Sequence, residues 1–109
     1  MLLREFFQNP KEKSQNQQPD LIDKVYWYIL DNDYLYKKFC LPIIHSGNID
    51  SAKKISTWAP MVGKGCIMFY NEHNMSGHPK NLFDKELRQE VCNRLAEYYA
   101  EEMADEQKD

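Results

Sequence analysis

The sequence predicts a mainly α-helical fold, a small single-domain bundle of three to four helices. Two observations lead to this prediction. The chain has 109 residues, of which 42% are hydrophobic and 28% charged, a composition that suits one globular core. Apolar residues also recur every three to four positions, most clearly over residues 81–103, which is the period of an α-helix. One short β-strand pair around residues 66–70 remains an alternative for that part of the chain.

The first twenty residues divide into an apolar arm and a polar linker. Residues 1–7 contain Leu2, Leu3, Phe6 and Phe7 at helical spacings, but an isolated helix needs roughly 12–15 residues to be stable. Residues 8–20 contain no large apolar side chain and are typical of a flexible connector. We therefore expect the arm to dock, either on the core of its own domain or in a groove of a partner.

The first full helix is expected after Asp20, a good N-cap residue. Apolar side chains at residues 22, 25, 26 and 29 share one face, and Trp27 lies nearly opposite them. A continuous helix would place Asp33 on the apolar face, so a break is predicted across residues 31–33. A second helix is predicted over residues 34–41, and Pro42 is expected to stop it.

The middle of the chain is harder to interpret. Residues 45–48 have the composition of a turn. Asp50 is predicted to cap a helix that carries Ala52, Ile55 and Trp58 and that ends before Pro60. Residues 66–70 form an uninterrupted apolar run, which suits a buried strand or a helix, and helix is favoured. Residues 71–80 are predicted to form a surface loop.

The last helix is the clearest in the sequence. Every fourth residue is apolar, and Cys92, Ala96 and Tyr98 fall beside this row: Phe83, Leu87, Val91, Leu95, Tyr99 and Met103. Asn81 is predicted to cap the helix, with Asp84 in support. Acidic residues at its end oppose the helix dipole, so the last turn is expected to fray. The helical domain is predicted to span residues 21–104, followed by an acidic tail at 105–109.

Charge and cysteine content limit the class of protein. The three cysteines form no close pair, and the apolar start meets Arg4 and Glu5 at once, which predicts a cytoplasmic protein without a secretory leader. No apolar run approaches the roughly 18 residues that a membrane span needs. The net charge is −3, but residues 37–80 are basic and the residues after 80 are acidic. No cofactor is predicted.

Residues with metal-binding or catalytic chemistry are few. Cys66, His73 and His78 are weak candidate zinc ligands, because thiolate and imidazole suit zinc but the spacing matches no compact zinc motif. The set could be completed by Cys40, His45 or Cys92. A base at Glu72 beside His73, or a thiolate at Cys40 with His45, would need a geometry that the sequence does not supply. A small metal-dependent enzyme or a zinc-stabilised module is therefore the second alternative function.

The basic middle segment gives the first alternative, a nucleic-acid-binding regulator. Lysines attract phosphate groups independently of sequence, and neighbouring aromatic side chains can stack on bases. Arginine, asparagine and glutamine, which read base edges, are scarce in the segment. The candidate residues are Lys37, Lys38, Lys53, Lys54 and Lys64.

The favoured function is non-catalytic binding of another protein, as a small inhibitor, adaptor, or immunity or anti-host factor of a phage or other mobile element. Fourteen aromatic residues exceed what one small core needs, and surplus aromatic side chains are enriched at binding hot spots. The acidic helix can also steer a basic partner. The candidate partner-binding residues are Leu3, Phe6, Phe7, Trp27, Tyr28, Glu97, Glu101 and Glu102.

Overall fold

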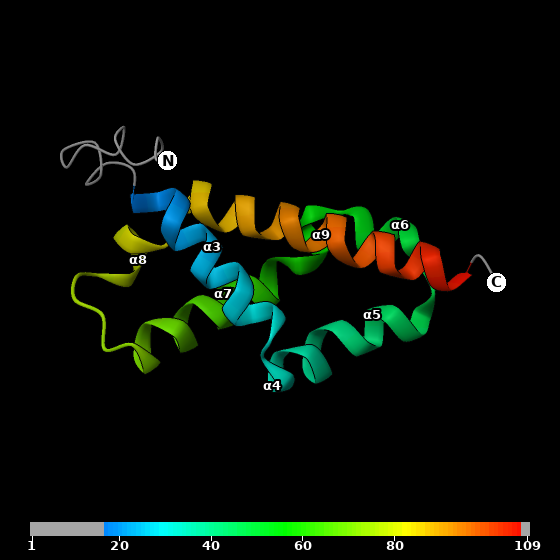
Figure 1. Ribbon diagram of the computed structural model, residues 1–109, viewed down its shortest axis with the longest axis horizontal. Coiled ribbons are helices and arrows are strands. Elements are labelled where there is room, and N and C mark those ends of the chain that lie inside the picture. Colours follow the sequence, from blue (N-terminus) through cyan, green and yellow to red (C-terminus); the bar gives the residue numbers. More distant parts are fainter. Residues whose placement is uncertain (1–16, 108–109) are drawn as a thin grey trace, which may run out of the picture.

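The computed structural model describes residues 17–107, and side chains over residues 20–106. This part of the chain is helical and contains no strand, which confirms the predicted helical class (Figure 1). The residues of the apolar arm, Leu3, Phe6 and Phe7 among them, lie outside the described range. The elements are α3 (Gln17–Leu30), α4 (Asp33–Leu35), the π-helical turn η1 (Tyr36–Cys40), α5 (Leu41–Ser46), α6 (Ile49–Lys53), α7 (Ile55–Glu72), α8 (Pro79–Leu82) and α9 (Lys85–Gln107).

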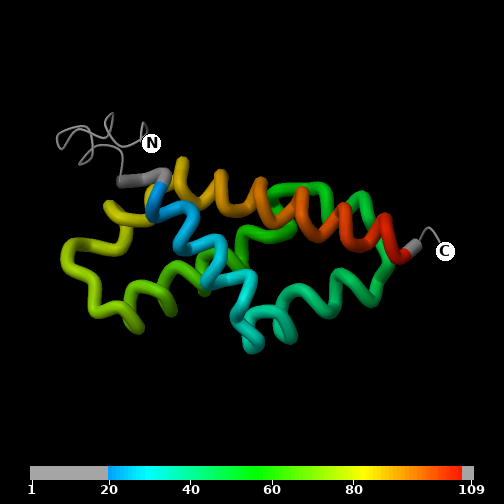
Figure 2. The backbone as a smooth tube through the Cα atoms, viewed as in Figure 1, coloured from blue at the N-terminus to red at the C-terminus, as the bar shows by residue number. Residues whose placement is uncertain are grey.

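Helix α9, with 23 residues, is the longest helix of the described part, and α7, α6 and α3 pack against it (Figure 2). All six residues of the predicted apolar row are buried: Phe83, just before α9, and Leu87, Val91, Leu95, Tyr99 and Met103 on α9. Trp58 of α7 stacks on Tyr99 with ring centroids 5.0 Å apart, and its indole N–H donates to the Ala52 carbonyl at 2.8 Å. The core therefore lies where α3, α6, α7 and α9 meet.

Short polar side chains mark several helix starts, but not always those that the sequence predicted. Helix α3 begins at Gln17, so Asp20 lies within its first turn. Asn48, rather than Asp50, caps α6 by accepting the Ser51 N–H at 3.1 Å. The predicted break after α3 is confirmed, because the helix ends at Leu30 and a new one begins at Asp33.

The start of α9 also differs from the prediction. Asp84 caps α9 by accepting the Leu87 N–H at 3.0 Å, while Asn81 lies inside the separate short helix α8. Pro79 at the first position of α8 starts a helical turn of its own, because its fixed φ angle suits that position. Helix α9 extends to Gln107, so the first residues of the predicted acidic tail are helical.

Neither of the two prolines that were predicted to end a helix, Pro42 and Pro60, does so. Pro42 lies in the first turn of α5, directly after η1, in which the Leu41 N–H bonds to the Tyr36 carbonyl five residues back. A proline ring clashes with the carbonyl four residues earlier in a regular α-helix, and this wider turn relieves the clash. Pro60 lies inside α7 on its exposed side, where water can take the place of the missing hydrogen bond.

Residues 66–70, which the sequence left open between strand and helix, lie inside α7. The apolar run conceals a helical period, because Met61, Val62, Cys66 and Phe69 are buried whereas Ile67 is 47% exposed. Gly65 allows α7 to approach α3 closely, since a Cβ atom there would lie 2.5 Å from Ile29 Cγ1. The strand pair is therefore replaced by one long helix of 18 residues.

Candidate functional site

The most distinctive surface of the described part lies along the C-terminal half of α9. Tyr98 projects from this helix and is 39% exposed, although the sequence placed it beside the buried row. It borders two pockets, one on either side of α9, and these are lined by four of the residues predicted to bind a partner: Trp27, Glu97, Glu101 and Glu102. We call this surface, with Tyr98 and the two pockets, the Tyr98 face.

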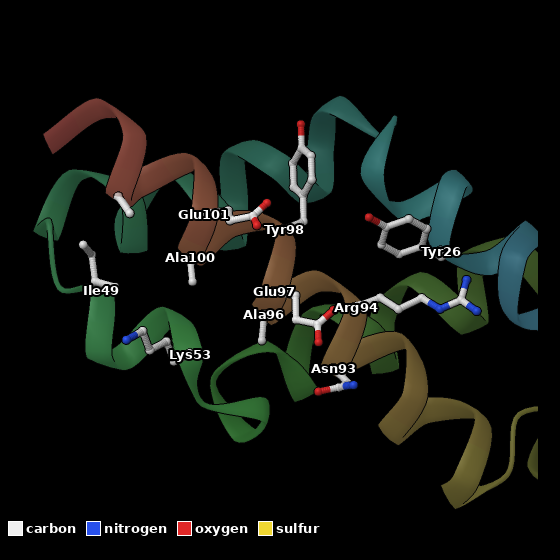
Figure 3. A pocket seen from close by; sticks show the side chains of 11 residues that line it. Tyr26, Ile49, Lys53, Asn93, Arg94, Ala96, Glu97, Tyr98, Ala100 and Glu101 are labelled. Carbon is white, nitrogen blue, oxygen red and sulfur yellow. The ribbon is translucent and has the colours of Figure 1, made fainter. Parts of the chain in front are cut away.

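The first pocket, named here the α6 pocket, is an open groove of about 820 Å³ between α3, α6 and α9. Figure 3 shows Tyr26 and Tyr98 along one edge and Lys53 on the opposite side. Small side chains on α9 leave the groove open: Ala96, Ala100 and Ala104. The candidate residues Glu97 and Glu101 both line this groove.

Arg94 lies in the α6 pocket, but its charge is used within the fold. Its Nη1 donates to Asp23 of α3 at 2.5 Å and its Nε donates to Glu90 at 3.3 Å. The hydrogen bond to Asp23 raises the pKa of the Arg94 guanidinium above its ordinary value. The guanidinium also lies 5.8 Å from the centre of the Tyr26 ring. Arg94 therefore joins α3 to α9, rather than serving as a free cation.

The second pocket, named here the terminal pocket, has a volume of about 360 Å³. It lies between the end of α3, the turn η1, helix α5 and the last turns of α9. Its aromatic lining residues are Trp27, Tyr36 and Tyr98, together with the largely buried Tyr99. Its charged lining residues are all acidic: Asp31, Glu102 and Glu106. Trp27 is 56% exposed, which makes it the most exposed of the large hydrophobic side chains in the described range.

Tyr28, the other aromatic candidate on α3, lines neither pocket. Its hydroxyl donates to Glu72 at 2.8 Å, and its ring meets the edge of Phe69 at 5.4 Å between centroids. Burial and the hydrogen bond to the Glu72 carboxylate raise the pKa of Tyr28 to about 12. Tyr28 and Glu72 thus connect α3 to α7. The Glu72 carboxylate accepts a hydrogen bond from the Tyr28 hydroxyl instead of orienting His73.

The candidate zinc ligands are not brought together. Cys66 is buried in α7, and this burial raises the pKa of its thiol to about 12. His73 follows the last residue of α7, with its Nδ1 3.0 Å from the Phe69 carbonyl oxygen. His78 caps α8 by accepting the Lys80 N–H at 3.1 Å. Within residues 20–106 no three histidine, cysteine or acidic side chains are grouped closely enough to hold a metal ion.

The candidate nucleic-acid residues come from three separate segments. Lys37 and Lys38 lie on η1, Lys53 and Lys54 lie at the end of α6, and Lys64 lies on α7. The Lys37 ammonium group is already paired with Asp33 at 3.1 Å. Lys53 lines the α6 pocket beside acidic residues of α9. The structure therefore adds no specific support for a phosphate-binding stripe.

Comparison with protein-family models, with curated proteins and with solved structures gives no match for this chain. None of the helices within residues 17–107 combines the length and the apolar character that crossing a bilayer requires. The chemistry of the Tyr98 face is thus the basis for a functional assignment. Sequence reasoning identified Trp27, Glu97, Glu101 and Glu102 on this face, but missed Asp31, Tyr36, Tyr98 and Glu106.

Proposed function

We propose that the protein is a non-catalytic protein-binding module, acting as a small inhibitor or adaptor, and that the Tyr98 face is its binding surface. The observation that supports this most directly is the exposure of Tyr98 and Trp27 around a pocket whose charged residues are all carboxylates. Tyrosine and tryptophan are the residues most enriched at binding hot spots. The carboxylates around them make the electrostatic potential of the pocket negative, which favours basic partners.

The aromatic rings are held in place before any partner arrives. Tyr26 packs against the edge of Trp27 with centroids 5.3 Å apart, and Tyr98 packs against Tyr99 at 4.9 Å. Tyr99 is itself stacked on the buried Trp58. A surface whose side chains are already ordered loses less entropy on binding. This arrangement supports recognition by preformed contacts.

The proposal is tested by affinity capture from a lysate of the cells that carry the protein, with the full chain as bait. Tyr98→Ala removes the central ring, and Tyr34→Ala is a matched control because Tyr34 is 49% exposed on α4 and lines neither pocket. Each variant is first checked for an unchanged melting temperature. We expect Tyr98→Ala to lose the captured protein and Tyr34→Ala to retain it, because truncation of a hot-spot aromatic costs about 2 kcal/mol or more.

Trp27→Ala gives an independent reading of the same surface. Because the indole is more than half exposed, its removal should weaken capture far more than it lowers the melting temperature. Equal capture by the wild type, Tyr98→Ala and Trp27→Ala would overturn the proposal. A bait that captures nothing with the wild-type surface would overturn it as well.

A further inference from the structure

We infer that the terminal pocket receives an arginine side chain from a basic segment of the partner protein. The inference rests on the proposed function and names the chemistry of the partner at this one pocket. Three properties of the pocket carry it: the sign of its charge, the helix ends that border it, and the order of apolar, aromatic and acidic groups along its walls.

The first property is uncompensated negative charge. Asp31, Glu102 and Glu106 line the pocket, and no lysine or arginine within residues 20–106 lines it. Within the described part of the chain, the ion pairs join other residues and use none of these three carboxylates. Glu102 and Glu106 are four residues apart on one helix, a spacing at which like charges repel. A cation entering the pocket would relieve this repulsion.

The second property is the direction of the bordering helices. Helix α3 ends at Leu30, beside the pocket residues Trp27 and Asp31, and α9 ends at Gln107, one residue beyond Glu106. A helix C-terminus has the negative end of the helix dipole, which a basic side chain usually compensates. Neither last turn contains a basic residue. Both dipoles therefore add to the negative potential of the pocket.

The third property is the match between the walls and a long cationic side chain. Leu30, Ile44 and Met103 offer apolar contacts to an aliphatic stem. Trp27 and Tyr98 contribute aromatic rings to the lining, and the face of an aromatic ring attracts cations and stacks on a flat guanidinium group. The carboxylates can accept the paired N–H groups of the same guanidinium. Arginine combines a stem, a flat cation and several parallel donors, so it fits this lining better than lysine does.

The test is a titration of the full chain with an acetylated peptide containing four arginines, followed by NMR of the tryptophan indole N–H groups. The chain contains two tryptophans, and Trp58 is fully buried, so its signal is an internal control. We expect the Trp27 signal to shift and saturate while the Trp58 signal stays in place. The control peptide contains citrulline, which keeps the length and shape of arginine but removes its charge.

Two double variants test whether the pocket carboxylates bind the peptide. Glu102→Gln with Glu106→Gln should weaken binding about tenfold or more, because hydrogen bonds to charged groups are among the strongest. Asp50→Asn with Glu86→Gln removes the same charge at exposed sites outside the pocket and should change the dissociation constant by less than about twofold. Circular dichroism shows that each variant is folded.

An unshifted Trp27 signal, an equal shift with the citrulline peptide, or an equal loss in both double variants would overturn the arginine pocket. Capture that still depends on Tyr98 would then leave the proposed binding function intact. The reverse result is also informative: the Trp27 signal shifts with the arginine peptide and saturates, but Tyr98→Ala captures the partner as well as the wild type does. The pocket would be real and the proposed binding surface would be wrong.

Discussion

Substitution of Gly65 by alanine tests the close approach of α7 to α3. The new Cβ atom would lie 2.5 Å from Ile29 Cγ1, 2.7 Å from Ile29 Cδ1 and 3.3 Å from Leu35 Cδ1. Ile29 is only 1% exposed and is branched at its Cβ atom, so it has few alternative rotamers. Either Ile29 or the helix backbone must therefore move. Gly63, two residues earlier in the same helix, has open space where its Cβ atom would be.

Comparison of the two glycines separates two contributions to the free energy of unfolding, the steric cost of packing and the gain in helix propensity. Alanine is favoured over glycine inside a helix by about 1 kcal/mol, and this gain applies at both positions. Overpacking of a tight core costs about 1–3 kcal/mol and applies only at Gly65. We expect Gly63→Ala to stabilise the protein by about 0.5–1 kcal/mol. We expect Gly65→Ala to be about 1–3 kcal/mol less stable than Gly63→Ala.

The measurement is urea unfolding of the wild type and both variants, followed by circular dichroism at 222 nm. Thermal unfolding gives a second readout. A difference of 1 kcal/mol corresponds to roughly 4–8 °C for a domain of this size, so the two variants should also differ clearly in melting temperature. Equal stability of Gly65→Ala and Gly63→Ala would refute the reasoning. It would mean that α3 and α7 do not pack through Gly65 at the distance described.

Three further predictions concern the caps, the core and pH. Asp84→Ala should lower the free energy of unfolding by about 1 kcal/mol, whereas Asn81→Ala should change it by less than about 0.5 kcal/mol, as urea unfolding will show. Trp58→Phe should cost about 1–3 kcal/mol, because the buried Ala52 carbonyl loses its donor; the same unfolding assay measures this. Stability should fall as pH rises above 9, because the unfolded state loses the Cys66 proton near the ordinary pKa of 9.0 and the folded state keeps it up to about 12. Urea unfolding at pH 8, 9 and 10 checks the sign, and a flat profile would contradict it.

Helices and their buried faces could be predicted because both depend on the local period of apolar residues. The row from Phe83 to Met103 is an example, and so is the break before Asp33, where continuation would have buried a charge. The exact helix starts could not be predicted in the same way. Asn81 and Asp84 are both good cap residues three positions apart, and in the structure Asn81 lies inside α8 whereas Asp84 caps α9.

The prolines show a second limit of sequence reasoning. Pro42 and Pro60 were expected to end helices because each removes an N–H donor and crowds the preceding turn. The structure accommodates Pro42 through a π-helical turn and Pro60 through its place on the exposed side of α7. Both arrangements require that tertiary packing stabilises the helix by more than the free energy that the proline costs locally. They leave no separate signal in the sequence.

The candidate binding surface was predictable only in part, for a related reason. Excess aromatic and acidic residues identified Trp27, Glu97, Glu101 and Glu102, each of which lines a pocket beside Tyr98. The pockets themselves are formed by segments far apart in the chain, so Tyr36 and Asp31 could not be assigned to them. Tyr98 was missed because the helical period places it beside the apolar row that contains the buried Tyr99, whereas Tyr98 is 39% exposed in the structure.

The charge at the ends of α3 and α9 argues for binding rather than stability. A basic residue in either last turn would stabilise the helix by about 0.3–1 kcal/mol, and replacing Glu102 or Glu106 would also remove a like-charge repulsion of about 0.2–0.5 kcal/mol. The chain instead directs two negative helix ends and three carboxylates at one pocket bordered by Trp27. Local electrostatic cost of this kind is typical of functional surfaces, where a partner supplies the missing charge. The same groups that weaken the isolated fold would then strengthen its complex.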